Sequence, residues 1–236
     1  MQRAVTTGDI TLTYEWQKKD IRRLNLHIRQ DGSLFVSSPY GVSAAAVDAF
    51  VLSRAGMIEK ARARWQQYRP QEGLLLKEGS ELPCLGRMLT LHLASGREDT
   101  ALQQGNELLL TLRHPEDEKA VQRLFEGWWQ DTCRTLCTAL CERWLPAFSR
   151  WGIPHPTLRF RRMSSRWGSC QTQTAAITLN LRLLHAPMEC IEYIIVHELA
   201  HLVEANHSPA FHRVVSEVMP DWKERRKKLE SAVIPQ

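Results

Sequence analysis

The chain has 236 residues, of which 43% are hydrophobic and 24% are charged, and its formal net charge is +5. This composition is typical of a globular protein with its own hydrophobic core, and it excludes an intrinsically disordered chain. Residues 1–16 lack the apolar segment of a signal peptide, and no stretch reaches the roughly 18 apolar residues that a membrane span requires. We therefore expect a cytoplasmic protein without membrane contact.

The basic residues gather in two clusters, at 159–166 and at 223–228. Such clusters are compatible with a nucleotide or nucleic-acid partner, although they are less dense than the basic stripe of a dedicated nucleic-acid binder. The alternative is a solvated basic surface without a specific partner. The charge pattern alone leaves both interpretations open.

The N-terminal region is predicted to form β-structure followed by a helix. Residues 10–16 and 21–28 carry β-branched and apolar residues in partial alternation, and 34–38 continues this pattern. Ser43 is a good N-cap for a helix that continues to about Tyr68. We expect these elements to belong to a β-rich region with one helix.

A second β-rich stretch is followed by a long helix. Residues 88–93 and 107–112 fit short strands, with glycines between them as turn signals. After His114-Pro115, apolar residues recur at intervals of three and four up to Pro146 or Pro154. We place a domain boundary at this shift, between a β-rich accessory region at 1–113 and a second domain at 114–236.

The second domain is predicted to combine a small sheet with a buried helix. Residues 158–162 and 175–183 are strand candidates, and the segment between them is predicted to be a connection. A helix is expected from Met188 to about Glu204. The fold class is therefore α+β, with a small sheet packed on the helix of residues 188–204.

That helix carries the pattern H-E-x-x-H. His197 and His201 are four residues apart, so a helix places both imidazoles on one face, where they can bind one metal ion. Glu198 lies about 100° round the helix from His197, near enough to contact a water on the metal rather than the metal itself. The pattern predicts a Zn2+ site with Glu198 as general base.

His207 is the predicted third ligand. It follows His201 by six residues, after Asn206, which we expect to reverse the chain in a left-handed conformation. Ser208-Pro209 is a typical start of a further helix. Other candidate third ligands lie downstream: Glu204, His212 and Glu217. The alternative for the whole cluster, histidines on the surface or in the core, would bury Glu198 without purpose.

Three stretches of the chain resemble the YgjP-like metallopeptidases, relatives of the SprT and WLM zincins. They are RMSSRWGSC at 162–170, ITLNLRL at 177–183 and IIVHELAHLVEANHSPAFH at 194–212. The resemblance implies a zincin-like catalytic domain with His207 as third ligand, and it makes residues 177–183 the edge strand beside the substrate. It also suggests that Arg166, Trp167 and Asn180 bind substrate. For Trp167 and Asn180, sheet packing and turn hydrogen bonds are the alternatives.

We therefore expect a zinc-dependent hydrolase, in first place a metallopeptidase acting on peptides or proteins through a metal-activated water. A nucleotide pyrophosphatase is the second hypothesis, because relatives of YgjP are also described as acting on UTP and the basic residues at 159–166 suit phosphates. The third is a DNA-associated protein-binding module with structural zinc, because SprT relatives act on DNA-bound proteins.

Overall fold

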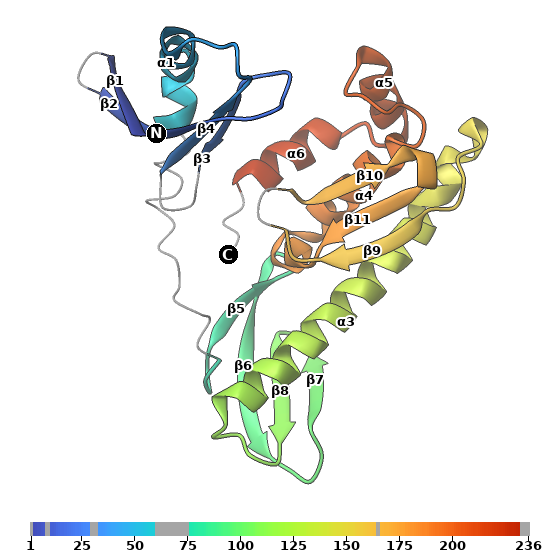
Figure 1. Cartoon of the computed structure of the whole chain (residues 1–236). Coiled ribbons are helices and arrows are strands. Elements are labelled where there is room, and N and C mark those ends of the chain that lie inside the picture. The colour runs from blue at the N-terminus through green and yellow to red at the C-terminus, as the bar shows by residue number, and fades with distance from the viewer. Residues whose placement is uncertain (1, 8–9, 29–32, 60–75, 164–165, 232–236) are drawn as a thin grey trace. The chain divides into compact units, whose positions relative to one another are not determined.

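The computed structural model describes the chain except for residues 1, 8–9, 29–32, 60–75, 164–165 and 232–236 (Figure 1). It divides into two compact units, residues 1–69 and residues 70–236. Among the described helices, none combines the length and the apolar character needed to cross a bilayer.

The first unit is a four-stranded sheet with a helix. Leu12 and Tyr14 alternate with exposed residues and Val36 with half-buried ones, and the three form the core together with Val47 and Val51 of the helix. Ser43 caps that helix, as predicted, through a bond from the Ala46 amide. The predicted end near Tyr68 lies outside the described residues. The elements are β1 (Gln2–Thr7), β2 (Ile10–Lys18), β3 (Asn25–Ile28), β4 (Leu34–Ser38) and α1 (Ala44–Leu52), with strand order β1-β2-β4-β3.

The second unit begins with another four-stranded sheet, which packs on a long helix. The strands predicted at 88–93 and 107–112 are confirmed, and Leu89 and Leu91 of one and Leu108 and Leu110 of its neighbour are buried in the core. The sheet has the order β5-β6-β8-β7. Its elements are β5 (Glu81–Cys84), β6 (Arg87–Ser95), β7 (Thr100–Gln104), β8 (Glu107–Leu112) and the helix α3 (Glu118–Trp144).

The division into compact units does not coincide with the boundary predicted at residue 114. The reason is the hydrophobic core: Leu82, Leu108 and Leu112 belong to one continuous cluster with α3 residues and with residues as far along as Leu229. The first unit has a separate cluster of its own. Strands β5 to β8 therefore belong to the same compact unit as the H-E-x-x-H helix.

A three-stranded sheet follows α3 and has the order β10-β11-β9. Its strands are β9 (Thr157–Arg161), β10 (Gly168–Gln171) and β11 (Ala176–Asn180). The prediction that 177–183 is an edge strand is wrong, because β11 pairs on both sides, parallel with β9 and antiparallel with β10. It also ends at Asn180, where a 3-10 helix begins. The edge strand is β10, in the segment that was predicted to be a connection.

Three C-terminal helices complete the unit: α4 (Met188–Ala200), α5 (Pro209–Val218) and α6 (Trp222–Ser231). Helix α4 is the central one, and nearly all of its side chains are buried. Its Glu192 pairs with Arg143 of α3 at 3.0 Å and with Arg225 of α6 at 2.6 Å. These ion pairs join α4 to its neighbours, which gives the H-E-x-x-H helix a fixed position.

Candidate metal centre

The first two predicted ligands lie at the C-terminal end of α4. The helix ends at Ala200, earlier than predicted. The capping residue His201 nevertheless keeps helical backbone angles, with φ −66° and ψ −21°. The spacing of four residues therefore still places His197 and His201 on one face, with ring centroids 4.9 Å apart.

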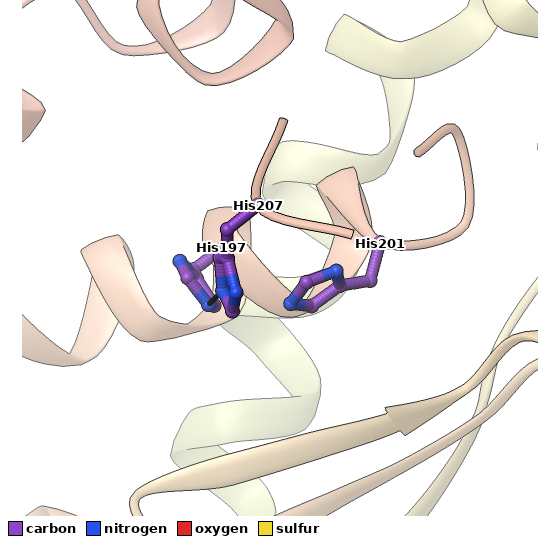
Figure 2. Close-up of side chains that lie close together, drawn as sticks. All are labelled: His197, His201 and His207. Atoms are coloured by element: carbon purple, nitrogen blue, oxygen red, sulfur yellow. Dashed lines mark hydrogen bonds between the residues drawn. The ribbon is translucent and has the colours of Figure 1, made fainter. Parts of the chain in front are cut away.

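The chain then reverses so that His207 comes back to this face (Figure 2). The turn is formed by backbone hydrogen bonds from Val203 and Glu204 to the carbonyl of Ala200, at 3.0 and 2.9 Å. The left-handed conformation predicted for Asn206 is wrong, since the described non-glycine residues with positive φ are Leu85 and Ala175. The predicted cap at Ser208 is confirmed by its bond from the Phe211 amide.

The three imidazoles converge on one point. Nε2 of His197 and Nε2 of His207 are 3.0 Å apart, and one ring nitrogen from each of the three histidines lies within 4.8 Å of the others. His201 and His207 have ring centroids 4.7 Å apart. The rings come from the end of α4 and from the segment that leads into α5 (Figure 2).

A buried phenylalanine supports all three rings. Phe211 is 1% exposed, and its centroid lies 5.0 Å from that of His197, 4.6 Å from that of His201 and 4.9 Å from that of His207. The sequence analysis missed this residue. The available signal was its position three residues after the Ser208 cap, where an apolar side chain of α5 can turn back towards the preceding segment.

Glu198 lies in the core beside this cluster. Its side chain is buried, and its Oε2 atom has no hydrogen-bond partner in the described part of the chain. Burial raises the pKa of Glu198 to about 8, and the charge of Arg166 opposes that rise. A buried carboxyl oxygen without a partner is costly, and such groups are concentrated at functional sites.

The carboxyl of Glu198 reaches β10 because residue 168 has no side chain. A Cβ atom at Gly168 would lie 2.6 Å from Oε1 and 2.8 Å from Cδ of Glu198, which is closer than real Cβ contacts. At Gly168 the edge strand thus approaches the helix too closely for a side chain. This residue was also missed by the sequence analysis.

The electrostatics of the histidines suit metal binding. Burial, with smaller contributions from His201 and His207, lowers the pKa of His197 to about 3, and burial also lowers the pKa of His201. Both rings therefore stay neutral at ordinary pH, which is the form that binds a metal. The Nδ1 atom of His201 donates to the Glu204 carbonyl at 3.2 Å, because a carbonyl can only accept, and this leaves Nε2 as the free electron-pair donor.

The comparison with protein families decides the classification. The model of the YgjP-like family, described as a metallopeptidase domain, matches residues 22–232. The chain belongs to the YgjP-like family. It is therefore a hydrolase of a metallopeptidase family, and the family implies a metal ion, usually zinc.

Two solved structures are similar to this YgjP-like chain. One is the metallopeptidase zymogen of Pyrococcus abyssi abylysin, with 29% identity over 40% of this chain and 92% of that chain and a TM-score of 0.36. The other is the metallopeptidase zymogen of Methanocaldococcus jannaschii jannalysin, with 19% identity over 40% of this chain and 93% of that chain and a TM-score of 0.34. No curated protein matches the chain.

The YgjP-like donor set fits a zinc ion. Nitrogen ligands about 2.0–2.1 Å from a tetrahedral zinc are about 3.3 Å apart, so the 3.0 Å between Nε2 of His197 and Nε2 of His207 needs to change by only a few tenths of an ångström. Three imidazoles suit zinc better than magnesium or calcium, which prefer oxygen ligands. The unpartnered oxygen belongs to Glu198, the residue that follows His197 on α4.

The three alternative ligands are not part of the cluster. Glu204 meets His201 through its backbone carbonyl, Glu217 pairs with Arg150, and the ring of His212 stacks on Trp222. Among the described residues, the group with metal-ligand spacing consists of His197, His201 and His207.

The residues suggested for substrate binding lie in different environments. Arg166 is exposed and lies two residues before the first residue of β10. Trp167 is half-buried and packs against the hydrophobic core, which agrees with the alternative that this residue has a packing role. Asn180 is 2% exposed, and its amide binds backbone atoms of Met163, Arg166 and Arg182, which agrees with the alternative of turn hydrogen bonding.

Proposed function

We propose that this protein is a zinc-dependent metallopeptidase in which His197, His201 and His207 hold the metal and Glu198 is the general base. The observation that carries the proposal is the buried, unpartnered Oε2 of Glu198 next to three convergent imidazoles. Three nitrogen ligands leave one tetrahedral position open, which is typical of a catalytic rather than a structural zinc.

Zinc, when bound, supplies a Lewis acid that polarises a carbonyl and lowers the pKa of water. The protein supplies the proton transfer. Oε2 of Glu198 accepts a proton from the attacking water, holds it in a buried environment that favours the neutral acid, and passes it to the amine of the leaving group. The hydrogen bond from His201 to the Glu204 carbonyl keeps the ring in the required tautomer and orientation.

The substrate would bind as an extended peptide along β10. One side of β10 pairs with β11, and the sheet order makes β10 an edge strand. An edge strand offers unpaired backbone groups to which a further strand can add. Because Gly168 of β10 lies against Glu198, a peptide added to this edge would pass beside the general base.

The two other hypotheses have less support in the chain. A pyrophosphatase would use the arginine cluster for phosphate, but Arg162 is already paired with Glu126 at 3.2 Å. A structural zinc would need a fourth protein ligand, whereas the donor group found among the described residues has three members.

The test uses the full chain, stripped of metal and reconstituted with zinc. We expect hydrolysis of unstructured polypeptide, and a loss of about 100- to 10,000-fold in Glu198→Gln with the zinc content unchanged. His207→Ala should lower the zinc content measured by elemental analysis. Pyrophosphate release from nucleoside triphosphates that is lost in Glu198→Gln, with polypeptide untouched, would reject the peptidase. Unchanged zinc stoichiometry in His207→Ala would reject this ligand.

A further inference from the structure

An exposed cation precedes the edge strand beside the general base. Arg166 has no salt bridge and no side-chain hydrogen bond to any residue that the structure describes. Its backbone carbonyl, by contrast, accepts a hydrogen bond from the amide of Asn180 at 2.7 Å. The main chain at this residue is thus held in place, whereas the guanidinium is available to a ligand.

The arginine lies two residues before the glycine that meets Glu198. The backbone amide of Asn180 donates to the Trp167 carbonyl at 2.9 Å, so the pairing with β11 continues to the residue next to Arg166. Gly168, the first residue of β10, is where a Cβ atom would meet the Glu198 carboxyl. Arg166 is thus held close to Glu198 along the chain, and its charge opposes the rise in the pKa of that carboxyl.

The side chain of Asn180 holds the main chain near Arg166 in place. Its Oδ1 accepts from the amides of Met163 and Arg182 at 3.2 and 3.1 Å, and its Nδ2 donates to the carbonyls of Met163 and Arg166, both at 2.7 Å. Every polar group of this buried side chain is thus used on the backbone of Met163, Arg166 and Arg182. These bonds fix the main chain from which the Arg166 side chain extends, and a fixed support is a requirement for specific recognition.

We propose that Arg166 binds a carboxylate of the substrate, so that the site selects peptides with an acidic side chain or a free C-terminus close to the scissile bond. This inference rests on the proposed peptidase function. The guanidinium presents paired N–H donors that match a carboxylate, and such charged hydrogen bonds are stronger than neutral ones. An extended peptide on β10 carries its side chains past this position.

The experiment compares matched peptides that differ in one carboxylate. The zinc-loaded full chain is given a degenerate peptide mixture, and mass spectrometry locates the cleavage sites. Cleaved sequences are then resynthesised as Glu and Gln pairs and as pairs with a free or amidated C-terminus. We expect kcat/KM to be about tenfold or more higher for the member with the carboxylate. A preference within the Glu and Gln pairs would show recognition of an acidic side chain, and a preference within the other pairs would show recognition of a free C-terminus.

The variants attribute the preference to one residue. Arg166→Ala should abolish it, and Arg166→Glu should shift it towards Lys-containing peptides, with zinc content unchanged in both. Arg161→Ala is the matched control, because Arg161 is also an exposed arginine and lies on β9, the opposite edge of the same sheet. This control should retain the preference.

Two failures are distinguishable. If the wild type cleaves peptides but treats both members of every pair alike, or if Arg166→Ala keeps the preference, the inference is wrong and the peptidase stands. If the zinc-loaded wild type cleaves no peptide, the proposed function is wrong and the inference falls with it.

Discussion

Replacement of Gly168 by alanine is the most direct perturbation of the contact between β10 and Glu198, the proposed general base. The added Cβ would lie 2.6 Å from Oε1 of Glu198 and 2.8 Å from its Cδ and Cγ, whereas ordinary contacts begin at 3.4 Å. The overlap is thus about 0.6–0.8 Å. Glu198 is 4% exposed and lies on a helix held by ion pairs, so neither side can move away freely.

The overlap translates into two measurable effects. Overpacking of this kind costs about 1–3 kcal/mol in the free energy of unfolding. A displacement of the general base by nearly 1 Å lowers the turnover rate on the order of 100-fold. The zinc content should not change, because none of the three proposed ligands lies on β10.

The assay measures kcat on a peptide substrate, zinc stoichiometry and thermal unfolding for the same preparation. Gly127→Ala is the matched control, because a Cβ at that position of α3 meets nothing within 4 Å. Alanine favours a helix over glycine by about 1 kcal/mol, so this control should keep its activity and gain stability. A Gly168→Ala enzyme with wild-type kcat would refute the assigned role of Gly168 in seating the carboxyl.

Three further changes test other parts of the molecule. Phe211→Ala should cost about 3–5 kcal/mol in unfolding free energy and also weaken zinc binding. Phe148→Ala removes an equally buried ring, so it should cost similar stability but leave the zinc affinity intact. Equal zinc affinities in the two variants would show that Phe211 does not support the histidine rings. Because the pKa of Glu198 is raised to about 8, the metal-free protein should lose a few kcal/mol of stability as pH rises from about 4.5 to about 8, and Glu198→Gln should remove this loss in urea titrations. The hydrogen bond from Arg3 lowers the pKa of Asp48. The ionised carboxylate therefore stabilises the first unit above the ordinary Asp pKa, and this stabilisation is lost as pH falls through the lowered value. Hydrogen exchange in β2 should show this acid sensitivity, and Asp48→Asn should abolish the sensitivity.

The convergence of the three histidines could be predicted because their arrangement is mostly local. Helical periodicity alone aligns His197 with His201, and the cap at Ser208 limits where the chain can go before His207. The detailed route differed from the prediction, since backbone turn bonds and not a left-handed Asn206 reverse the chain. Several routes through a short segment lead to the same end point, so the ligand set is less sensitive to the conformation than the turn itself.

The surroundings of the site could not be predicted because they depend on pairing across the chain. Strand β10 has the sequence Gly-Ser-Cys-Gln, which carries no apolar alternation, and it forms only because β11 offers it a partner. The role of Gly168 depends on a carboxyl that lies thirty positions away in the sequence. The same holds for the compact units, since the leucines of β8 are assigned to the second unit by their contact with α3.

The charges around the site connect the proposed chemistry with the proposed specificity. His197 and His201 are neutral at ordinary pH, so these two rings would not offset the charge of a divalent cation bound in the proposed site. Arg166 adds a positive charge that opposes the rise in the pKa of Glu198. Under the proposed function, the metal-loaded site would therefore attract an anionic group of the substrate. A carboxylate on the substrate would offset this positive charge at Arg166 and leave Glu198 free to accept the proton.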